Sequence, residues 1–391
     1  MILYDPSLTI NFHDYGIMLP VSPDRKKKIL DFLEKDHFPD DNCPVNKGSS
    51  LSYPGPALDL AEALAFLEIT GDKTIGREDL ERVHSREFID SLYDNTPGKG
   101  LEAALLTAFE LIDAQGRPNR YEPQIAKKPL TDLFSTILAQ AGGTWLACRL
   151  ALKAGFCYLF DGGMHHARYD SGSGFCLIND VTIAAFKIFA EAFQNSPAPS
   201  QKPVELIWII DLDAHKGDGT AELIKLSRQR GALLDPQQPV SRNGSKKPCI
   251  LCLSIHMAKG WPLDSESIAA ARAGRAPLVP SDVDIGIDSG EEGEYTSRLM
   301  QGINELEELS AALGKPDLVL VVDGNDPYEH DELPSSSPLK LSLEQCVERG
   351  NYVYRYLTAR SIPSAWILSG GYGKRAWEPA AYFLQGIKSK T

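Results

Sequence analysis

Acidic and imidazole side chains gather in a short segment that begins at Asp211. The side chains of Asp211, Asp213 and His215 stand two positions apart, a spacing that puts them on one side of an extended segment. Carboxylates and imidazoles are ligands of Zn²⁺, and a catalytic zinc keeps three protein ligands and one open position for water. Two ligands from this segment would need a third from elsewhere in the chain, and Asp326 is the natural supplier. The pattern therefore predicts a metal centre that activates water for hydrolysis.

Five apolar runs of strand length are each followed at once by polar or metal-capable residues. An isolated Asp-x-His would more simply be a turn or a helix cap. In open α/β sheets, however, ligands bind outside the carboxyl ends of the strands, so five such clusters predict one converging site. The runs are Gly155–Phe160, Leu206–Ile210, Cys249–Leu253, Leu318–Val322 and Ala365–Leu368. The clusters are Gly162-Gly163-Met164-His165-His166, Asp211-Leu212-Asp213-Ala214-His215, Ser254-Ile255-His256, Asp323-Gly324-Asn325-Asp326 and Ser369-Gly370-Gly371-Tyr372.

Segments of helical period lie between the apolar runs. This alternation is typical of βαβ units, and it predicts an α/β fold with a mostly parallel central sheet and helices on both faces. No break in composition interrupts it, so residues 1–391 are expected to form a single domain. Two stretches rich in Pro, Ser, Gln and basic residues, 195–203 and 235–248, are expected to be surface insertions. The helical segments are Leu130–Lys153, Val181–Phe193, Glu294–Leu313 and Leu343–Thr358.

The composition is that of an ordinary globular protein, with 43% hydrophobic and 24% charged residues. No apolar stretch reaches the roughly eighteen residues of a membrane span. The formal net charge of −13 argues against sequence-independent binding to nucleic acid. The first residues lack the basic flank and apolar run of a signal peptide, and seven cysteines in so long a chain indicate free thiols. We therefore expect a cytoplasmic protein, or a nuclear one if the source is eukaryotic.

Glycines and two further side chains refine the predicted site. Gly162 and Gly163 allow a tight backbone turn beside it, and two glycines also precede Tyr372, whose phenol can donate a hydrogen bond. By itself, a Gly-Gly-Tyr sequence would be read as a structural turn. Cys176 is the thiol nearest this chemistry, and a structural role is expected because a metal already supplies the nucleophile.

Taken together, these clusters resemble the histone deacetylase family of zinc-dependent hydrolases, which has the arginase/deacetylase fold. The match runs from the N-terminus to about residue 380, and it looks closest to the class IV branch. The signatures are Val83-His84-Ser85, Phe88-Ile89, Ala141-Gly142-Gly143-Thr144, Gly162-Gly163-Met164-His165-His166-Ala167, Gly174-Phe175-Cys176, Asn179-Asp180, Asp211 to Thr220, Ser254-Ile255-His256 and Ser369 to Arg375.

The resemblance implies roles for individual residues. It places the zinc ligands on Asp213, His215 and Asp326, the tandem histidines on His165 and His166, their carboxylate partners on Asp211 and Asp218, and the carbonyl-polarising phenol on Tyr372. It places the acyl-lysine tunnel on Gly174, Phe175 and Trp261, with Leu333 at the rim. It also implies a structural K⁺ held at Asp211, Asp213, His215, Ser254 and Ile255.

A mechanism follows from these assignments. His166 would remove a proton from the water and later protonate the leaving amine, while His165 stays charged or orients the water. Asp211 and Asp218 would fix the tautomers of the two imidazoles. Tyr372 would donate a hydrogen bond to the developing oxyanion.

Some positions depart from the family pattern and bear on the acyl group rather than on the reaction. Asn325 stands where many relatives carry a bulky apolar residue, Asp323 where a small residue is usual, and Trp261 where phenylalanine is commoner. The insertion at 235–248 would reshape the rim. The class IV resemblance suggests hydrolysis of long fatty-acyl chains as a further activity. The glycine-rich turns at 162–163 and 172–174 would leave room for such a chain behind the metal.

Rival functions remain open from the sequence. An arginase-type ureohydrolase needs two metals and further acids, and glycine stands at 217 and 324 where those acids are wanted. An acetylpolyamine deacetylase favours acidic rim residues, whereas Leu333 is apolar. A catalytically inactive module that binds acyl-lysine would keep the tunnel but would not hydrolyse the substrate. The expected partner is therefore an acylated lysine peptide or protein, or an acetylated polyamine; the sequence indicates neither the physiological substrate nor the oligomeric state.

Overall fold

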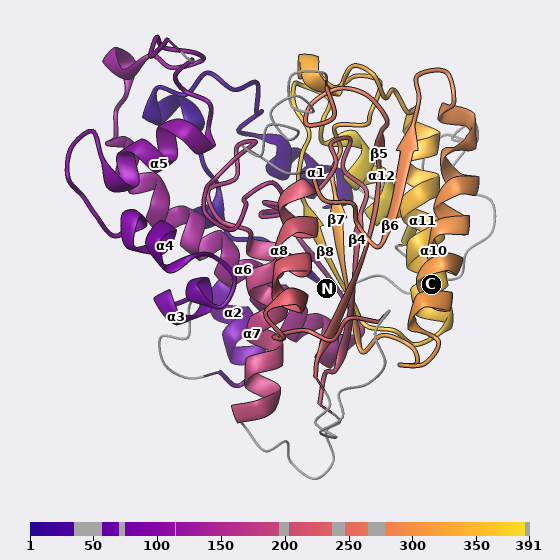
Figure 1. Ribbon diagram of the computed structural model, residues 1–391. Coiled ribbons are helices and arrows are strands. Elements are labelled where there is room, and N and C mark those ends of the chain that lie inside the picture. The colour runs from indigo at the N-terminus through magenta and orange to yellow at the C-terminus, as the bar shows by residue number, and fades with distance from the viewer. Residues whose placement is uncertain are drawn as a thin grey trace.

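A parallel β-sheet of eight strands runs through the middle of the protein (Figure 1). The computed structural model describes residues 1–34, 57–69, 75–113, 115–194, 203–236, 247–264 and 278–387. Every strand pairing in this sheet is parallel, and the spatial order is β2-β1-β3-β8-β7-β4-β5-β6. The strands are β1 (Ile2–Leu3), β2 (Ala57–Leu58), β3 (Phe156–Leu159), β4 (Leu206–Asp211), β5 (Cys249–Met257), β6 (Val283–Ile287), β7 (Leu318–Asp323) and β8 (Ser364–Leu368).

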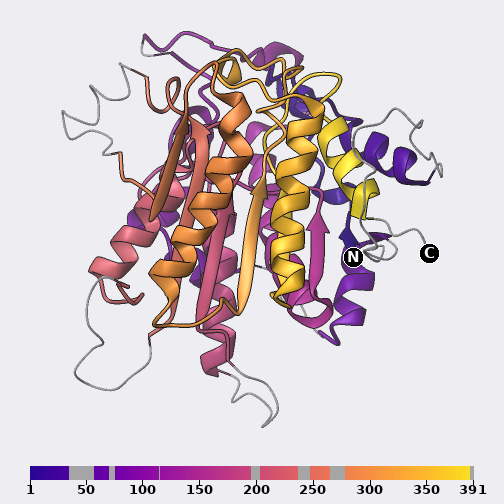
Figure 2. The same ribbon diagram turned by 90° about the vertical axis from the view of Figure 1, so that its right-hand side faces the viewer.

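Helices cover both faces of the sheet, as Figure 2 shows in the turned view. Helices α6, α7 and α8 lie on one face, and α10, α11 and α12 lie on the other. The helices are α1 (Arg25–Glu34), α2 (Leu60–Phe66), α3 (Arg77–Glu81), α4 (Arg86–Leu92), α5 (Gly100–Ala108), α6 (Leu133–Ala154), α7 (Asp180–Gln194), α8 (Asp218–Gln229), α10 (Tyr295–Ser310), α11 (Leu343–Ala359) and α12 (Glu378–Ile387). Short 3₁₀ turns occupy Pro6–Leu8, Phe12–Tyr15, Pro123–Ile125, Leu130–Asp132, Glu292–Glu294 and Pro334–Ser336.

The alternation of side chains along the central strands explains the two-sided core. In β4, Ile207 and Ile209 pack into the core beneath α6 and α7, while Trp208 and Ile210 pack into the core beneath α10 to α12. All are buried, so both faces of the strand lie in apolar surroundings. This is why the strand sequences are continuous apolar runs rather than alternating ones.

The predicted fold class and the main elements are confirmed. The five predicted strands and the four predicted helices are present, with ends that differ by a few residues. The largest shift is at the end of β5, which continues to Met257, so Ser254, Ile255 and His256 belong to the strand and do not follow it as predicted. At Leu130 a 3₁₀ turn precedes α6, and that helix is followed by Gly155 in the left-handed conformation. The predicted insertions at 195–203 and 235–248 fall for the most part outside the described residues.

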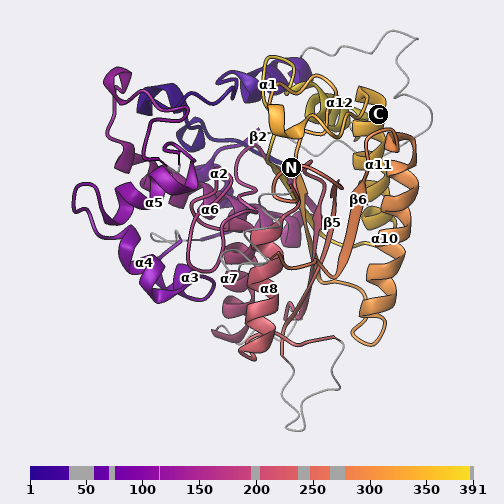
Figure 3. The same cartoon turned by 45° about the horizontal axis from the view of Figure 1, so that its top comes forward.

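Because all strands are parallel, their carboxyl ends meet at one edge of the sheet. That edge is at the top of Figure 1, and Figure 3 brings it forward with α1 lying beside α12. The loops after β3, β4, β7 and β8 therefore converge there, together with residues from the N-terminal segment. Within the described ranges, none of the helices has the length and apolar character needed to span a bilayer.

Candidate active site

A buried cluster of two carboxylates and one imidazole lies at this edge of the sheet. Candidate ligand atoms of Asp213, His215 and Asp326 all lie within 4.8 Å of one another. His215 Nδ1 is 2.8 Å from Asp326 Oδ2 and 3.3 Å from Asp213 Oδ1. Asp213 and His215 follow β4, and Asp326 follows β7, which is hydrogen-bonded to β4. The pairing of these two strands thus brings together residues that are more than a hundred positions apart.

The charge of this cluster favours a cation. Burial by itself would lower the pKa of His215, but Asp213 and Asp326 outweigh that effect and raise the pKa to about 10. Two buried carboxylates compete for one imidazole, and a metal ion would satisfy all three groups at once. Two carboxylates and one imidazole also match the donor set of a catalytic zinc that keeps a further position for water. The residues present therefore fit such an ion.

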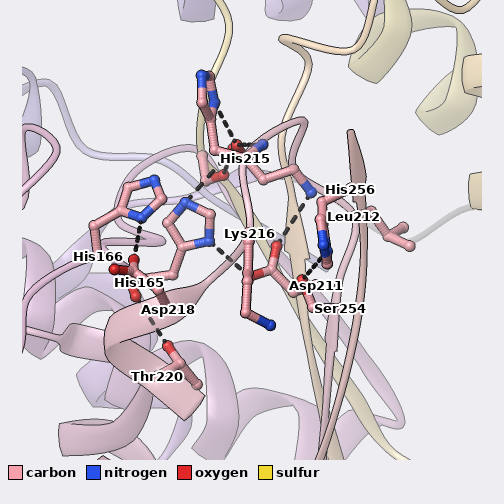
Figure 4. Close-up of polar contacts among 12 residues, drawn as sticks. His165, His166, Asp211, Leu212, His215, Lys216, Asp218, Thr220, Ser254 and His256 are labelled. Carbon is pink, nitrogen blue, oxygen red and sulfur yellow. Dashed lines mark hydrogen bonds and ion pairs between the residues drawn. The ribbon is translucent and has the colours of Figure 1, made fainter. Parts of the chain in front are cut away.

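Two histidines stand beside the cluster, each joined to its own carboxylate (Figure 4). His165 donates from Nδ1 to Asp211 Oδ2 at 2.6 Å, and His166 donates from Nδ1 to Asp218 Oδ1 at 2.8 Å. Their rings lie 3.9 Å apart between centroids. The hydrogen bond to the aspartate keeps a hydrogen on Nδ1 of each histidine. It therefore fixes the tautomer of the ring and the direction of its Nε2. Asp218 also pairs with the buried guanidinium of Arg168.

The two histidines differ in their electrostatic surroundings. Burial and the neighbouring His165 together lower the pKa of His166 to about 4, against the pull of Asp218. Burial also opposes the charged form of His165, but Asp211 and Asp213 outweigh it and raise the pKa of His165 to about 9. Near neutral pH, His166 is therefore a neutral proton acceptor and His165 a cation. Two adjacent histidines thus differ in charge, one neutral and one positive.

The loop that carries Tyr372 is held from two sides. Arg25 donates to the backbone oxygens of Ser369 at 2.8 Å and Gly370 at 2.7 Å, and Asp331 accepts from the Tyr372 N–H at 2.7 Å. A Cβ on Gly370 would lie 2.5 Å from Asp213 Oδ2, so only glycine allows this approach. Burial and the nearby carboxylates hold the pKa of the Tyr372 phenol well above its usual value, so it remains a hydrogen-bond donor.

A buried arginine joins the two loops that bear the cluster. Arg349 of α11 donates to the backbone oxygen of Leu212 at 2.5 Å and also to that of Gly324. Leu212 directly precedes Asp213, and Gly324 stands two residues before Asp326. The Arg349 guanidinium also lies 3.5 Å from the carboxylate of Asp323. One side chain thus fixes the separation of the carboxylates.

A cavity of about 310 Å³ contains the cluster, the tandem histidines and Tyr372. The four predicted tunnel residues, Gly174, Phe175, Trp261 and Leu333, all line it. Trp261 meets His166 edge-on with 4.6 Å between ring centroids, and Phe175 meets Tyr372 in the same manner at 6.4 Å. The structure thus brings the predicted aromatic walls to the predicted metal cluster.

Comparisons with known proteins agree with this architecture. The model of the histone deacetylase domain matches residues 19–385. The chain belongs to the histone deacetylase family. The family predicted from the sequence is therefore confirmed, and so is the class of enzyme, a deacetylase-type hydrolase.

Histone deacetylase 2 of Arabidopsis thaliana is 24% identical over 387 residues, which are 99% of this chain and 78% of that protein. An uncharacterized protein of Picosynechococcus sp. is 28% identical over 237 residues, or 61% of this chain and 63% of that protein. Among solved structures, an acetylpolyamine aminohydrolase of Burkholderia pseudomallei has a TM-score of 0.58 at 16% identity, with 99% of this chain and 98% of that chain covered. This last likeness shows the fold alone.

Two of the departures from the pattern of the histone deacetylase family lie off the cavity. Asp323 accepts from the Tyr158 hydroxyl at 2.7 Å, and Asn325 donates to the backbone oxygen of Ala376 at 2.8 Å, so the lining of the cavity includes neither. Their unusual identity therefore does not alter the cavity wall. Burial keeps the pKa of the Cys176 thiol far above its usual value, in accord with a structural role.

The glycines of the turns at 162–163 and 172–174 allow neighbouring side chains to approach closely. A Cβ on Gly162 would lie 2.5 Å from Asp180 Oδ2, and one on Gly174 would lie 2.4 Å from the ring of Trp261. The space beside these glycines is filled by neighbouring side chains. The missing Cβ atoms allow close packing of the loops, and Gly162, Gly163 and Gly174 also line the cavity. The room for a long acyl chain behind the metal remains a prediction.

Several contacts of the site could not be predicted from the sequence, although His84 belongs to one of the quoted signatures. His84 accepts from the Asn179 N–H at 3.0 Å and lies 2.7 Å from the Arg168 backbone oxygen, so it ties two site loops together. Glu110 and Arg120 line the mouth of the cavity as an ion pair at 3.2 Å. Glu110, Arg120 and Phe175 all have a positive φ, a conformation that costs on the order of 1 kcal/mol or more for such residues. Only long-range packing reveals these contacts.

Proposed function

We propose that this protein is a zinc-dependent hydrolase that removes an acetyl or longer acyl group from the ε-amine of lysine in a peptide or protein. The observation that carries the proposal is the buried cluster of Asp213, His215 and Asp326 beside two histidine–aspartate dyads in one cavity. A general base, a charged histidine and a phenol donor stand around one candidate metal site. These are the groups that hydrolysis of an amide needs.

Asp213, His215 and Asp326 would hold the zinc, which when bound supplies polarisation of the amide carbonyl and acidification of water. His166 takes the proton of the attacking water on Nε2, because its Nδ1 is engaged with Asp218 and its low pKa keeps it neutral. The same Nε2 then returns the proton to the departing lysine amine. His165 remains charged and stabilises the negative charge that develops on oxygen as the water attacks the carbonyl carbon.

Tyr372 donates its phenolic hydrogen to the carbonyl oxygen as that oxygen gains negative charge. Its loop is fixed by Arg25 and by Asp331, so the donor is in place before the substrate arrives. Trp261 and Phe175 form apolar walls that suit the four-carbon stem of lysine rather than a polar group.

A K⁺ ion near the dyads is part of the proposal. Its ligands would be oxygens of Asp211, Asp213, His215, Ser254 and Ile255. Asp211 on β4 and Ser254 on β5 are register partners. The pairing of these strands therefore brings the ligands that begin at Asp211 close to Ser254 and Ile255. Bound there, K⁺ would lower the proton affinity of Asp211 and so temper the charge of His165.

An acetylated polyamine is the alternative substrate. Such a substrate carries a second cationic amine, which an acidic cavity mouth would bind. Here Leu333 is apolar, and the carboxylate of Glu110 is already paired with Arg120. Among the described residues at the mouth, these two offer no surplus negative charge to a second amine, and an acyl-lysine peptide fits better.

Turnover of the zinc-loaded protein on two substrates tests the proposal. An acetyl-lysine peptide and an acetylated polyamine are each assayed for released amine. We expect a higher kcat/KM for the peptide. A preference for the polyamine would favour the alternative, and hydrolysis of neither would indicate a binding module without catalytic activity.

A further inference from the structure

A buried ion pair forms part of the wall of the cavity that contains the metal cluster. Lys26 and Asp161 both line the cavity that contains the metal cluster, and their charged atoms are in contact. The Lys26 side chain is 15% exposed and the Asp161 side chain 3%. Lys26 belongs to α1, and Asp161 stands four residues before His165, so the pair joins the N-terminal helix to the site loop after β3.

The hydrogen bonds around this pair leave one atom unused. Lys26 donates to Thr9 Oγ1 at 3.1 Å, and Gln140 donates to Asp161 Oδ1 at 3.1 Å and to the Leu8 backbone oxygen at 2.8 Å. Asp161 Oδ2 is buried, and no protein group in the described part of the chain donates to it. A carboxylate oxygen in this state needs water.

Apolar side chains make up much of the wall of the cavity that contains the pair. Leu19, Val21, Ile137 and Met164 line the same cavity. Burial raises the pKa of Asp161 to about 6 even though Lys26 opposes the rise. Burial therefore already disfavours the charged form of Asp161. Removal of the remaining water would increase the free-energy cost of that buried charge.

We propose that the Lys26–Asp161 pair limits the length of the acyl chain that this protein hydrolyses, so that acetyl and other short acyl groups are accepted and long fatty-acyl groups are rejected. This inference rests on the proposed function. A short acyl group at the metal cluster leaves the water on Asp161 in place. A longer tail displaces that water with methylene groups, which cannot donate a hydrogen bond to Asp161 Oδ2.

Removal of the ion pair should change how binding depends on the length of the acyl chain. In an apolar cavity, each buried methylene strengthens binding by about fourfold. Beside a buried ion pair, this gain is offset by the loss of hydration of two charges. Replacing both charges with apolar side chains of similar size should therefore restore the gain per methylene.

The experiment uses one peptide that carries acetyl, butyryl, octanoyl or myristoyl lysine. In the wild-type protein, kcat/KM should be highest for acetyl or butyryl and at least about tenfold lower for octanoyl. In Lys26→Met/Asp161→Leu, the ratio of octanoyl to acetyl should rise by about tenfold or more. The matched control is Lys27→Met, which removes the next lysine, a 71% exposed side chain paired with Asp31; its chain-length profile should equal that of the wild type.

A binding measurement separates this inference from the proposed function. The dissociation constants of acetate, butyrate and octanoate, the free acids that hydrolysis releases, are measured by calorimetry on the wild type and on the double variant. Octanoate should bind the wild type no more tightly than butyrate, and it should bind the double variant at least about tenfold more tightly than it binds the wild type. If no acyl-lysine peptide is hydrolysed, the proposed function is wrong, and the carboxylate series alone decides the inference.

Two results would overturn the inference. One is a wild-type preference for octanoyl or myristoyl over acetyl, and the other is an unchanged chain-length ratio in the double variant. Should that variant fail to fold, Lys26→Gln/Asp161→Asn removes the charges but keeps the shapes. Its octanoyl-to-acetyl ratio should rise at least about threefold, because no charge is left to desolvate, and the absence of a rise would contradict the proposal.

Discussion

Replacing Arg349 by methionine removes a buried cation that joins the two loops of the metal cluster. The side chain is 1% exposed, and it donates to the backbone oxygens of Leu212 and Gly324. Methionine fills much of the same volume, so the change removes charge and hydrogen bonds more than packing. Asp323 would keep its hydrogen bond from Tyr158 but lose its cation.

The size of the effect follows from these losses. Each buried carbonyl left without a donor costs about 1–3 kcal/mol, and breaking a buried ion pair by removing one partner costs about 3–5 kcal/mol. These terms overlap, so we expect Arg349→Met to lower the free energy of unfolding by about 3–5 kcal/mol. Because the loops carry the candidate ligands, we also expect zinc to bind about 10–100-fold more weakly.

Urea unfolding and a zinc titration against a competing chelator measure the two effects. The control is Arg355→Met, the same change at an exposed position of the same helix, for which we expect a change within about 0.5 kcal/mol. An Arg349→Met protein that loses less than about 1 kcal/mol, or that binds zinc as tightly as the wild type, would refute the reasoning.

Three further results are expected. Tyr372→Phe should fold normally, and its kcat should fall by about 10²–10³-fold with little change in KM, because the phenol acts on the transition state; a kcat near that of the wild type would assign the oxyanion role elsewhere. His166→Ala should lose about 10²–10⁴-fold in kcat and more than His165→Ala, because the proton transfers belong to His166; comparable losses, or the reverse order, would contradict this division. The pKa of buried His84 falls from 6.5 to about 4, so the folded state binds its proton only at lower pH than the unfolded state does. His84 therefore contributes stability that is complete above about pH 6.5 and is lost as the pH falls toward 4, at most about 3 kcal/mol. Urea midpoints of wild type and His84→Gln between pH 7.5 and 5 should show a shallower loss for the variant, and equal slopes would disprove it.

The sequence was sufficient for the parts of the fold that rest on local patterns. The central strands are continuous apolar runs, so β4, β5 and β7 could be predicted. No comparable pattern marks β1, which is two residues long, or β6, where Asp284 and Gly286 interrupt the apolar run. Both are recognised only because neighbouring strands pair with them.

The residues of the candidate site also divide into those that local sequence patterns predict and those that they do not. Residues that directly follow predicted strands, such as Asp213 and Asp326, could be chosen from the sequence because strand ends converge. Contacts across long separations could not be chosen, such as Lys26 with Asp161 or Arg349 with two backbone oxygens. No spacing rule joins a helix residue near the N-terminus to a loop after β3. The roles assigned to the histidines, to Tyr372 and to the K⁺ ligands remain predictions.

The central claim is that the cluster of Asp213, His215 and Asp326 holds a zinc ion on which amide hydrolysis depends. Asp326→Asn tests it most directly, because the amide oxygen can still accept from the Ala214 N–H while the negative charge is lost. Zinc content and acetyl-lysine turnover are measured on the same folded samples. We predict one zinc per wild-type chain with turnover, and loss of both in the variant. Full zinc content with unchanged turnover in Asp326→Asn would contradict the account.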